Sequence, residues 1–218
     1  MQKDYISQND EAVLFLMSKD KRLEKLIKYI GDIECNVHSD SYAFIINELV
    51  GQMLSNKVAK VISSRLLDLC DGMISIEKVS QLSFEQLKTA GLSKAKCEYI
   101  IEFTKAVNEG TLNLSSLHLL SDDKVIYELT RIRGIGTWTA KMYLLFVLQR
   151  SDVLPIEDVA FLQGYKWLYR TDDVSKESII KKCKKWKSYS SIAARYLYRA
   201  VDTGLIKSQF HLYKDIGV

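Results

Sequence analysis

The sequence has no run of about 18 apolar residues, the length that a membrane-spanning helix needs. Its first ten residues, MQKDYISQND, also lack the basic end and the apolar stretch of a secretory signal peptide. We therefore expect an intracellular protein without a membrane partner, located in the cytoplasm or at the nucleoid if the source is bacterial.

Cysteine and histidine are scarce and dispersed. None of the four cysteines, Cys35, Cys70, Cys97 and Cys183, belongs to a C-x-x-C pair, and the three histidines are equally scattered. Zinc sites and iron–sulfur clusters need clustered ligands, so the sequence predicts neither. We expect four reduced cysteines in the interior and no zinc, flavin or nucleotide cofactor.

Proline is nearly absent, with one residue in 218, and most of the ten glycines separate segments of helical periodicity. In YAFIINELVGQML, residues 42–54, apolar side chains recur at steps of three and four. Four serines precede such segments and are expected to cap them: Ser55, Ser83 with Gln86 in a capping box, Ser93 and Ser121. The pattern predicts helices over 42–54, 56–70, 84–90, 94–107 and 124–132. We expect an all-α protein of roughly ten short helices.

The composition is that of an ordinary globular protein, with 47% hydrophobic and 27% charged residues. The formal net charge of +4 permits a polyanionic partner but does not require one. Composition alone therefore leaves the function open.

The segment IRGIGTWTAKMYLLF, residues 132–146, places two glycines before a helix that is apolar on nearly every side. Such a helix must be buried, so its first turn is the part expected to reach the surface. Gly134 and Gly136 let the backbone approach a partner closely, and the N–H groups of a helix start bind phosphate well. The alternative is a tight helix–helix connection without a ligand.

Five segments follow one another in a specific order. They are VGQMLSNKVA (50–59), GLSKAKCEYI (91–100), LTRIRGIGTW (129–138), PIED (155–158) and KKWKSYSSIAARYLYRA (184–200). Together they resemble the helix-hairpin-helix DNA glycosylases, the HhH-GPD superfamily, in the branch similar to 3-methyladenine DNA glycosylase II. The resemblance runs from about residue 9 to residue 202.

This resemblance implies two helical subdomains with the helix-hairpin-helix, about residues 123–148, at the cleft between them. We expect one subdomain to comprise residues 40–159 and the other residues 1–39 with 160–218. The implied partner is double-stranded DNA that contains alkylated bases, bound by a monomer.

The implied activity is that of a monofunctional glycosylase, which flips out alkylated purines such as 3-methyladenine or 7-methylguanine and hydrolyses the N-glycosidic bond. Two alternatives remain open. One is a glycosylase of the same fold for oxidised or deaminated bases, and the other is a DNA-binding protein without catalysis.

The resemblance assigns the catalytic carboxylate to Asp158, three residues after Pro155. A carboxylate beside C1′ stabilises the cationic sugar that forms as the base leaves. Asp158 also precedes an apolar helical run, so an N-cap is the alternative role, and the two roles are compatible. Trp138 stands where relatives that cut the strand carry a nucleophilic lysine, so the sequence predicts base release without strand cleavage.

Aromatic faces attract a cationic base, and by resemblance Trp138, Tyr198 and Met142 form its pocket. Gln52 and Met53 occupy the positions that insert into the duplex, where a flexible apolar side chain fills the vacated space. Packing in the core is the alternative for each of these residues.

By resemblance, a DNA phosphate binds at the hairpin turn, and the backbone carbonyls of the same turn hold a structural Na⁺ or K⁺. The run KKCKKWK, residues 181–187, adds positive charge on what we expect to be a solvated helix face. The phosphate-binding residues are Gly134, Ile135, Gly136, Thr137 and Arg133, and the cation ligands are the carbonyls of Thr130, Ile132 and Gly134.

Overall fold

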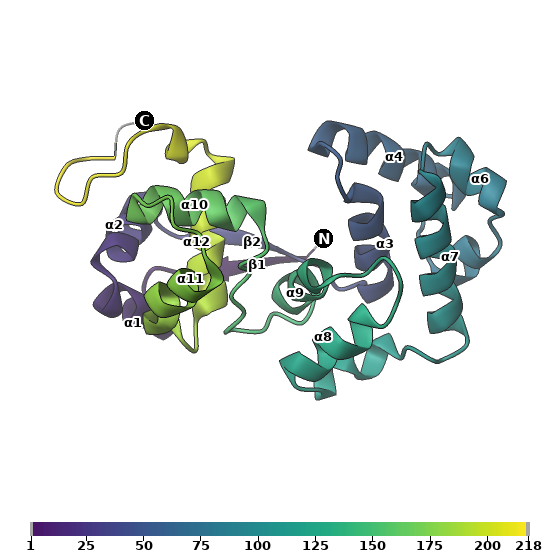
Figure 1. The fold of residues 1–218 in the computed structure, drawn as a ribbon, viewed down its shortest axis with the longest axis horizontal. Helices are drawn as coiled ribbons and strands as arrows, with labels where there is room; N and C mark the ends of the chain where they lie inside the picture. The colour runs from purple at the N-terminus through teal and green to yellow at the C-terminus, as the bar shows by residue number, and fades with distance from the viewer. Residues whose placement is uncertain (1, 217–218) are drawn as a thin grey trace. The chain divides into compact units, whose positions relative to one another are not determined.

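The computed structural model describes the backbone of residues 2–216 and the side chains of residues 5–216. Most of the described chain is helical, which confirms the all-α class, and one small sheet accompanies the helices (Figure 1). The chain forms two compact units. We call His38–Leu148 the central unit, and Met1–Val37 with Gln149–Val218 the terminal unit.

The helices of the central unit begin where the sequence places its caps. The hydroxyl of Ser55 accepts from Val58 N, and Ser83 with Gln86 forms the capping box. Ser121 is the N-cap of its helix but makes no side-chain capping hydrogen bond. The elements are α3 (Ser41–Gly51), α4 (Asn56–Leu69), α5 (Ile76–Ser80), α6 (Phe84–Thr89), α7 (Lys94–Asn108), the 3₁₀ helix η1 (Leu114–Leu119), α8 (Asp122–Thr130) and α9 (Thr137–Phe146).

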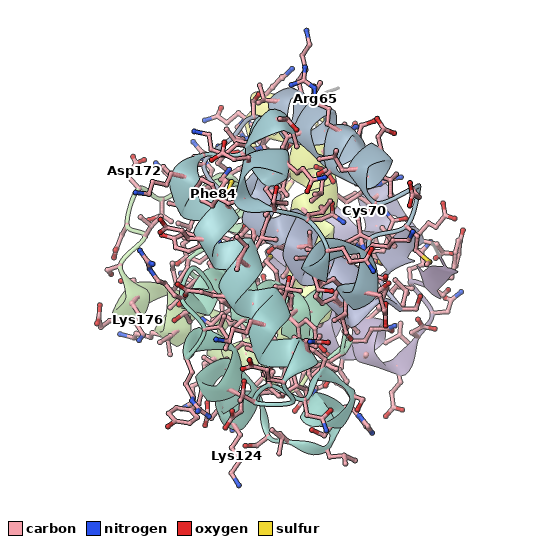
Figure 2. The ribbon with its side chains drawn as sticks, turned by 90° about the vertical axis from the view of Figure 1, so that its right-hand side faces the viewer. Arg65, Cys70, Phe84, Lys124, Asp172 and Lys176 are labelled. Atoms are coloured by element: carbon pink, nitrogen blue, oxygen red, sulfur yellow. The ribbon has the colours of Figure 1, made fainter. Side chains whose placement is uncertain are left out.

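Helix α3 lies at the centre of this unit, in contact with α4, α7 and α9. Ile45, Ile46 and Leu49 are fully buried, as the periodicity of 42–54 predicts. The helix nevertheless ends at Gly51, three residues earlier than expected, because Gln52 and Met53 leave the helical conformation. Charged side chains such as Arg65 on α4 and Lys124 on α8 point outward (Figure 2).

The terminal unit combines helices with an antiparallel pair of strands that the sequence analysis did not predict. Ile6 pairs with Ile33 at one end of the sheet. Each strand has only five residues, too short for alternation to stand out from helical periodicity. The elements are β1 (Gln2–Ile6), α1 (Glu11–Lys19), α2 (Lys21–Ile30), β2 (Ile33–Val37), α10 (Val159–Tyr169), α11 (Lys176–Cys183), η2 (Lys184–Trp186), α12 (Ser190–Asp202) and η3 (Leu205–Lys207).

A close crossing of α10 and α12 organises the core of this unit. At Gly164, in the middle of α10, an added Cβ would lie 2.9 Å from the Cβ of Leu197 and 3.2 Å from its carbonyl oxygen. Glycine is therefore required here for close approach, since a larger side chain would force the two helices apart. The crossing fixes α10, whose N-terminus carries Asp158.

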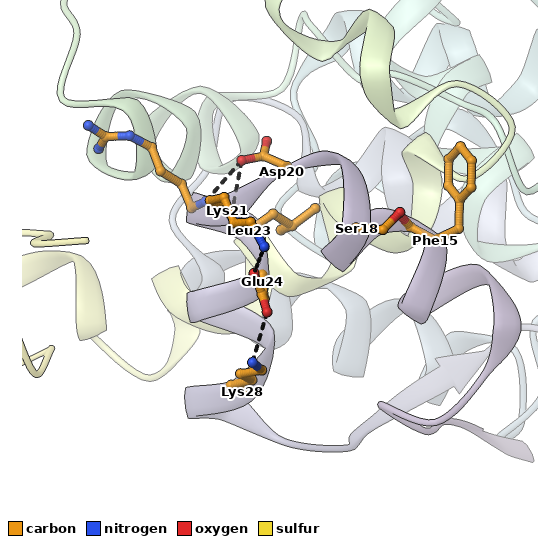
Figure 3. A network of polar contacts seen from close by, with 8 residues as sticks. Phe15, Ser18, Asp20, Lys21, Leu23, Glu24 and Lys28 are labelled. Carbon is orange, nitrogen blue, oxygen red and sulfur yellow. Dashed lines mark hydrogen bonds and ion pairs between the residues drawn. The ribbon is translucent and has the colours of Figure 1, made fainter. Parts of the chain in front are cut away.

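Asp20 joins α1 to α2 and caps the second helix. Its Oδ1 accepts from Arg22 N at 3.0 Å and from Leu23 N at 3.3 Å (Figure 3). On the exposed side of α2, Glu24 bridges Lys21 at 3.0 Å and Lys28 at 2.8 Å. Hydrogen bonds from both lysines lower the pKa of Glu24.

The observed division of the chain differs from the predicted one, which placed residues 40–159 together. Residues 149–159 pack with the terminal unit. The N-terminal end of α12 holds them there, because Val153 N donates to Ser191 Oγ at 2.9 Å and Ser190 Oγ donates to Asp152 Oδ1 at 2.6 Å. Asp158 consequently belongs to the terminal unit and the hairpin to the central unit.

Candidate active site

The hairpin consists of α8, the turn at residues 131–136 and α9. Gly134 has φ +90°, and a Cβ at this position would lie 2.3 Å from the Tyr99 ring. Both the backbone conformation and the ring beneath it therefore require glycine. Ile135 is buried at 4% exposure and anchors the turn.

Gly136 differs from Gly134, because nothing in the fold explains why it is glycine. It is the N-cap of α9 with φ −95°, which any residue adopts, and an added Cβ would meet no atom within 4 Å. As glycine, it has no side chain with which to cap the helix. Gly136 and Thr137 are exposed, so the positive end of the helix dipole lies at the protein surface. The geometry suits close approach by an anion.

Arg133, predicted to bind phosphate, forms ion pairs within the protein. Its Nη1 lies 3.3 Å from Glu98 Oε2 and 3.3 Å from Glu102 Oε1, and its guanidinium lies over the Tyr99 ring at 5.6 Å. A hydrogen bond to Glu102 and the charges of both carboxylates raise its pKa. The arginine ties the hairpin to α7, and its charge is balanced by two carboxylates.

The three carbonyls proposed as cation ligands are partly used by the fold. Ile132 O accepts from Ile135 N at 3.1 Å, and Gly134 O accepts from the side-chain nitrogen of Gln52 at 2.8 Å. Each carbonyl oxygen has a second lone pair, and backbone oxygen is suitable chemistry for Na⁺ or K⁺. The hydroxyl of Thr130, which is not one of the proposed ligands, donates to Ile126 O at 2.8 Å.

Gln52 and Met53 lie in the short connection between α3 and α4. Gln52 reaches the hairpin through its bond to Gly134 O. Met53 is 101% exposed and has φ 57°, so core packing, the alternative for this residue, is wrong. A fully exposed methionine on left-handed backbone has no role in stabilising the fold.

Trp138 and Met142 are one helical turn apart in α9 and share a face of that helix. Trp138 is half-buried, whereas Met142 is only 4% exposed. The indole therefore has accessible surface, whereas the methionine has little, and their role in a base pocket stays a prediction.

Asp158 is the N-cap of α10, and its side chain is 9% exposed. Its Oδ1 accepts from Phe161 N at 2.8 Å, and its own N–H donates to Pro155 O at 3.0 Å. The capping role is therefore real, but it uses one acceptor position of a carboxylate that has four. The neighbouring Glu157 is exposed, whereas Asp158 is buried.

Tyr198 lies on α12, in the same unit as Asp158. Burial and the negative charge of Asp158 raise the pKa of Tyr198 far above its usual value, so the phenol stays neutral. The residue was predicted as a wall of the base pocket, and that role stays a prediction.

The lysines of residues 181–187 do not all lie on a solvated face. Lys185 forms an ion pair with the buried Asp20 at 3.0 Å, and Lys182 and Lys185 lie over the Tyr169 ring at 5.2 and 5.4 Å. Lys182 is exposed, as expected, whereas Lys185 is partly buried by its ion pair with Asp20.

The described residues contain no cluster of three or more metal-ligating His, Cys, Asp or Glu side chains. All four cysteines are buried free thiols. Within residues 2–216 no helix has both the length and the apolar character needed to cross a membrane.

Comparison with known proteins identifies the family. The protein-family model described as "HhH-GPD superfamily base excision DNA repair protein" matches residues 46–188. The chain belongs to the HhH-GPD superfamily. The matched range covers the connection between α3 and α4, the hairpin, Asp158 and the lysine run.

Individual HhH-GPD relatives extend the comparison. A crystal structure of a DNA-3-methyladenine glycosidase from Bacillus halodurans is 34% identical, with a TM-score of 0.83, over 92% of this chain and 94% of that one. The DNA-3-methyladenine glycosylase 1 of Schizosaccharomyces pombe is 26% identical over 90% of both proteins. A putative DNA-3-methyladenine glycosylase of Bacillus subtilis, YfjP, is 33% identical over 58% of this chain, and the match spans 44% of that protein.

Sequence reasoning gave no role to Lys96 and Tyr99, although both lie in the segment 91–100 that carries the resemblance. Tyr99 fills the space that Gly134 leaves open, and Lys96 donates to two carbonyls at the end of α3. The signal for Lys96 was its spacing. It stands four residues before Ile100 and seven before Phe103, on the apolar face of α7, where a lysine needs oxygen partners.

Proposed function

We propose that this HhH-GPD protein is a monofunctional DNA glycosylase that excises alkylated purines and leaves an abasic site. The observation that carries the proposal is the buried Asp158 carboxylate, fixed by Phe161 N and accompanied by the neutral Tyr198 hydroxyl. The names of the relatives support the same substrate class.

The chemistry needs one anion and one water molecule. A purine methylated at N3 or N7 is already cationic, so it leaves without prior protonation, taking the electron pair of the C1′–N bond. Positive charge then develops at C1′, where the Asp158 carboxylate stabilises it. Water adds to C1′ and releases one proton, so that the products are a neutral base, an abasic sugar and H⁺.

Trp138 favours hydrolysis over strand cleavage. A nucleophilic lysine at this position would form a Schiff base with C1′, whereas an indole presents an aromatic face to a cationic base. Lys141 stands three residues later in α9 and does not occupy the position of that lysine. We expect the abasic DNA strand to remain intact after base release.

The DNA phosphate is expected to bind the backbone at Gly136 and Thr137, with the hairpin carbonyls holding a monovalent cation beside it. Support comes from the exposed start of α9, where a Cβ on Gly136 would meet no atom within 4 Å, and from a relative that was solved with abasic DNA, the S. pombe 3-methyladenine DNA glycosylase, at 26% identity and a TM-score of 0.81. We expect one protein molecule to bind each lesion.

Replacing Gly136 by aspartate separates folding from DNA binding. Aspartate is a preferred N-cap and favours the helix dipole, so Gly136→Asp should unfold at the same temperature as the wild type or higher. Its charge and its Cβ occupy the space of the phosphate, so the affinity for duplex DNA should fall by about tenfold or more. Thermal denaturation and fluorescence anisotropy with a labelled duplex measure the two effects. Equal affinity for both proteins would remove the phosphate from this turn.

The test of the activity is release of bases from duplex DNA that has been treated with a methylating agent. Released 3-methyladenine and 7-methylguanine are separated chromatographically, and parallel reactions use duplexes with 8-oxoguanine, hypoxanthine or uracil. Release restricted to an oxidised or deaminated base would favour the rival enzyme. Tight binding without release of any base would show a DNA-binding protein without catalysis.

A further inference from the structure

The connection between α3 and α4 holds one residue in an unfavourable state. Met53 has a left-handed backbone, which costs a residue with a side chain roughly 1 kcal/mol, and exposes an apolar side chain completely. On either side of it the backbone is fixed, since Leu54 N donates to Gly51 O at 3.1 Å and Ser55 caps α4. The conformation of Met53 is therefore imposed by its neighbours.

Lys96 supplies the strongest of these constraints. Its ammonium group donates to Val50 O and to Gln52 O, each at 2.7 Å, across the C-terminal end of α3. The last carbonyls of a helix lack partners within the helix, and a cation is favourable at that end. Burial lowers the pKa of Lys96, which is consistent with its position against the interior.

The same helix, α7, also holds the hairpin. Tyr99, one turn after Lys96, lies beneath Gly134, and two glutamates of α7 pair with Arg133. Gln52 completes the connection, because its backbone carbonyl accepts from Lys96 while its side chain donates to Gly134 O at 2.8 Å. Helix α7 thus fixes both the loop that carries Met53 and the turn that is proposed to bind phosphate.

We propose that Lys96 is a positioning residue that holds residues 52–54 in the conformation from which Met53 enters the duplex, in register with the hairpin turn. The inference rests on the proposed function, since it assigns Met53 to the vacated base position. Lys96 donates to the backbone carbonyls of Val50 and Gln52. It acts on DNA through Met53.

The role predicts a specific coupling between two side chains. Without the ammonium group, water replaces it at the carbonyls of Val50 and Gln52, and Met53 is free to adopt the more stable negative φ. Removing Lys96 should therefore abolish the insertion of Met53 and the DNA affinity that it provides. In a protein that already lacks the methionine side chain, removing Lys96 should cause no further loss of affinity. A purely structural lysine would give additive losses.

The experiment is a double-mutant cycle of Lys96→Met and Met53→Ala, with Lys105→Met on an exposed turn of α7 as the control. The probe is a duplex with 2-aminopurine opposite a stable abasic analogue, so insertion is read from fluorescence and needs no base release. Lys96→Met should lower the fluorescence rise to the level of Met53→Ala and weaken binding by about tenfold. The double variant should match Met53→Ala, and Lys105→Met should match the wild type.

Lys96→Arg keeps donors for both carbonyls and should recover most of the signal, whereas Lys96→Gln, with one short amide, should not. A full signal from Lys96→Met and Lys96→Gln, additive losses in the double variant, or no fluorescence change with the wild type would each overturn the inference. Should Lys96→Met fail to fold, Lys96→Gln replaces it in the cycle. Release of methylated bases by the wild type is measured separately, so failure of the proposed function is distinguished from failure of the positioning role.

Discussion

Asp158→Asn should lower the single-turnover rate of base release by about 10²- to 10³-fold while leaving the protein as stable as the wild type. Asparagine is as good an N-cap as aspartate, and its side-chain oxygen still accepts from Phe161 N. What the variant lacks is the negative charge. The loss of rate therefore reports electrostatic stabilisation of the sugar and not damage to α10.

Two further variants make this interpretation specific. Glu157→Gln removes a charge from the adjacent, exposed residue and should leave the rate unchanged. Asp158→Ala removes the cap as well as the charge, so its rate should match that of Asp158→Asn while its free energy of unfolding falls by about 1 kcal/mol. The rates are measured on methylated duplex DNA, and stability is measured by urea denaturation.

Binding to a duplex with an abasic analogue provides the third measurement. Asp158→Asn should bind it nearly as well as the wild type, because the phosphate contacts proposed at Gly136 and Thr137 are untouched. If this variant instead releases alkylated bases at the wild-type rate, Asp158 is only a cap. The catalytic assignment would then have to be abandoned.

The sequence predicted the local features of the fold well, since these depend on neighbours in the chain. The caps at Ser55, Ser83 and Ser93 are formed, and the helices that they begin end within two residues of the expected positions. These signals are hydrogen bonds and periodicities within a few residues. The five-residue strands β1 and β2 were missed because their pairing joins segments about 30 residues apart.

The candidate site was predictable only in part. Motif spacing predicted Asp158 and the two glycines, but it could not show that Tyr99 fills the space at Gly134 or that Arg133 is held by two carboxylates. Motif spacing also could not show that Met53 departs from the apolar face of α3. The apolar spacing continues through Met53, and a change of backbone conformation at a single residue does not alter that spacing. Contacts between distant segments decide each of these points.

Asp20→Ala is expected to have the largest effect on stability, lowering the free energy of unfolding by about 3–5 kcal/mol. Asp20 is 2% exposed, and besides capping α2 its Oδ2 accepts from the Tyr169 hydroxyl, from Trp186 Nε1 at 3.0 Å and from Lys185 at 3.0 Å. Alanine would leave these donors without an acceptor in the interior. Tyr169 is the last residue of α10, the helix that begins after Asp158, so the same change loosens the support of the catalytic carboxylate.

The pH dependence of the stability lost in Asp20→Ala shows whether the ionised carboxylate is responsible for it. Burial by itself raises the pKa of Asp20, but hydrogen bonds from Tyr169 and Trp186 and the charge of Lys185 outweigh it, and the net pKa lies below the usual value. The carboxylate therefore stabilises the fold fully above the usual aspartate pKa of about 4, and this contribution is lost as the pH falls through the lowered value. The difference in unfolding free energy between wild type and Asp20→Ala should be constant near neutral pH and shrink in strong acid.

The control variant is Asp10→Ala, which removes an exposed aspartate at the start of α1 and should lower the free energy of unfolding by about 1 kcal/mol or less. If Asp20→Ala and Asp10→Ala lose the same free energy of unfolding, the buried contacts of Asp20 stabilise the fold no more than an exposed aspartate does.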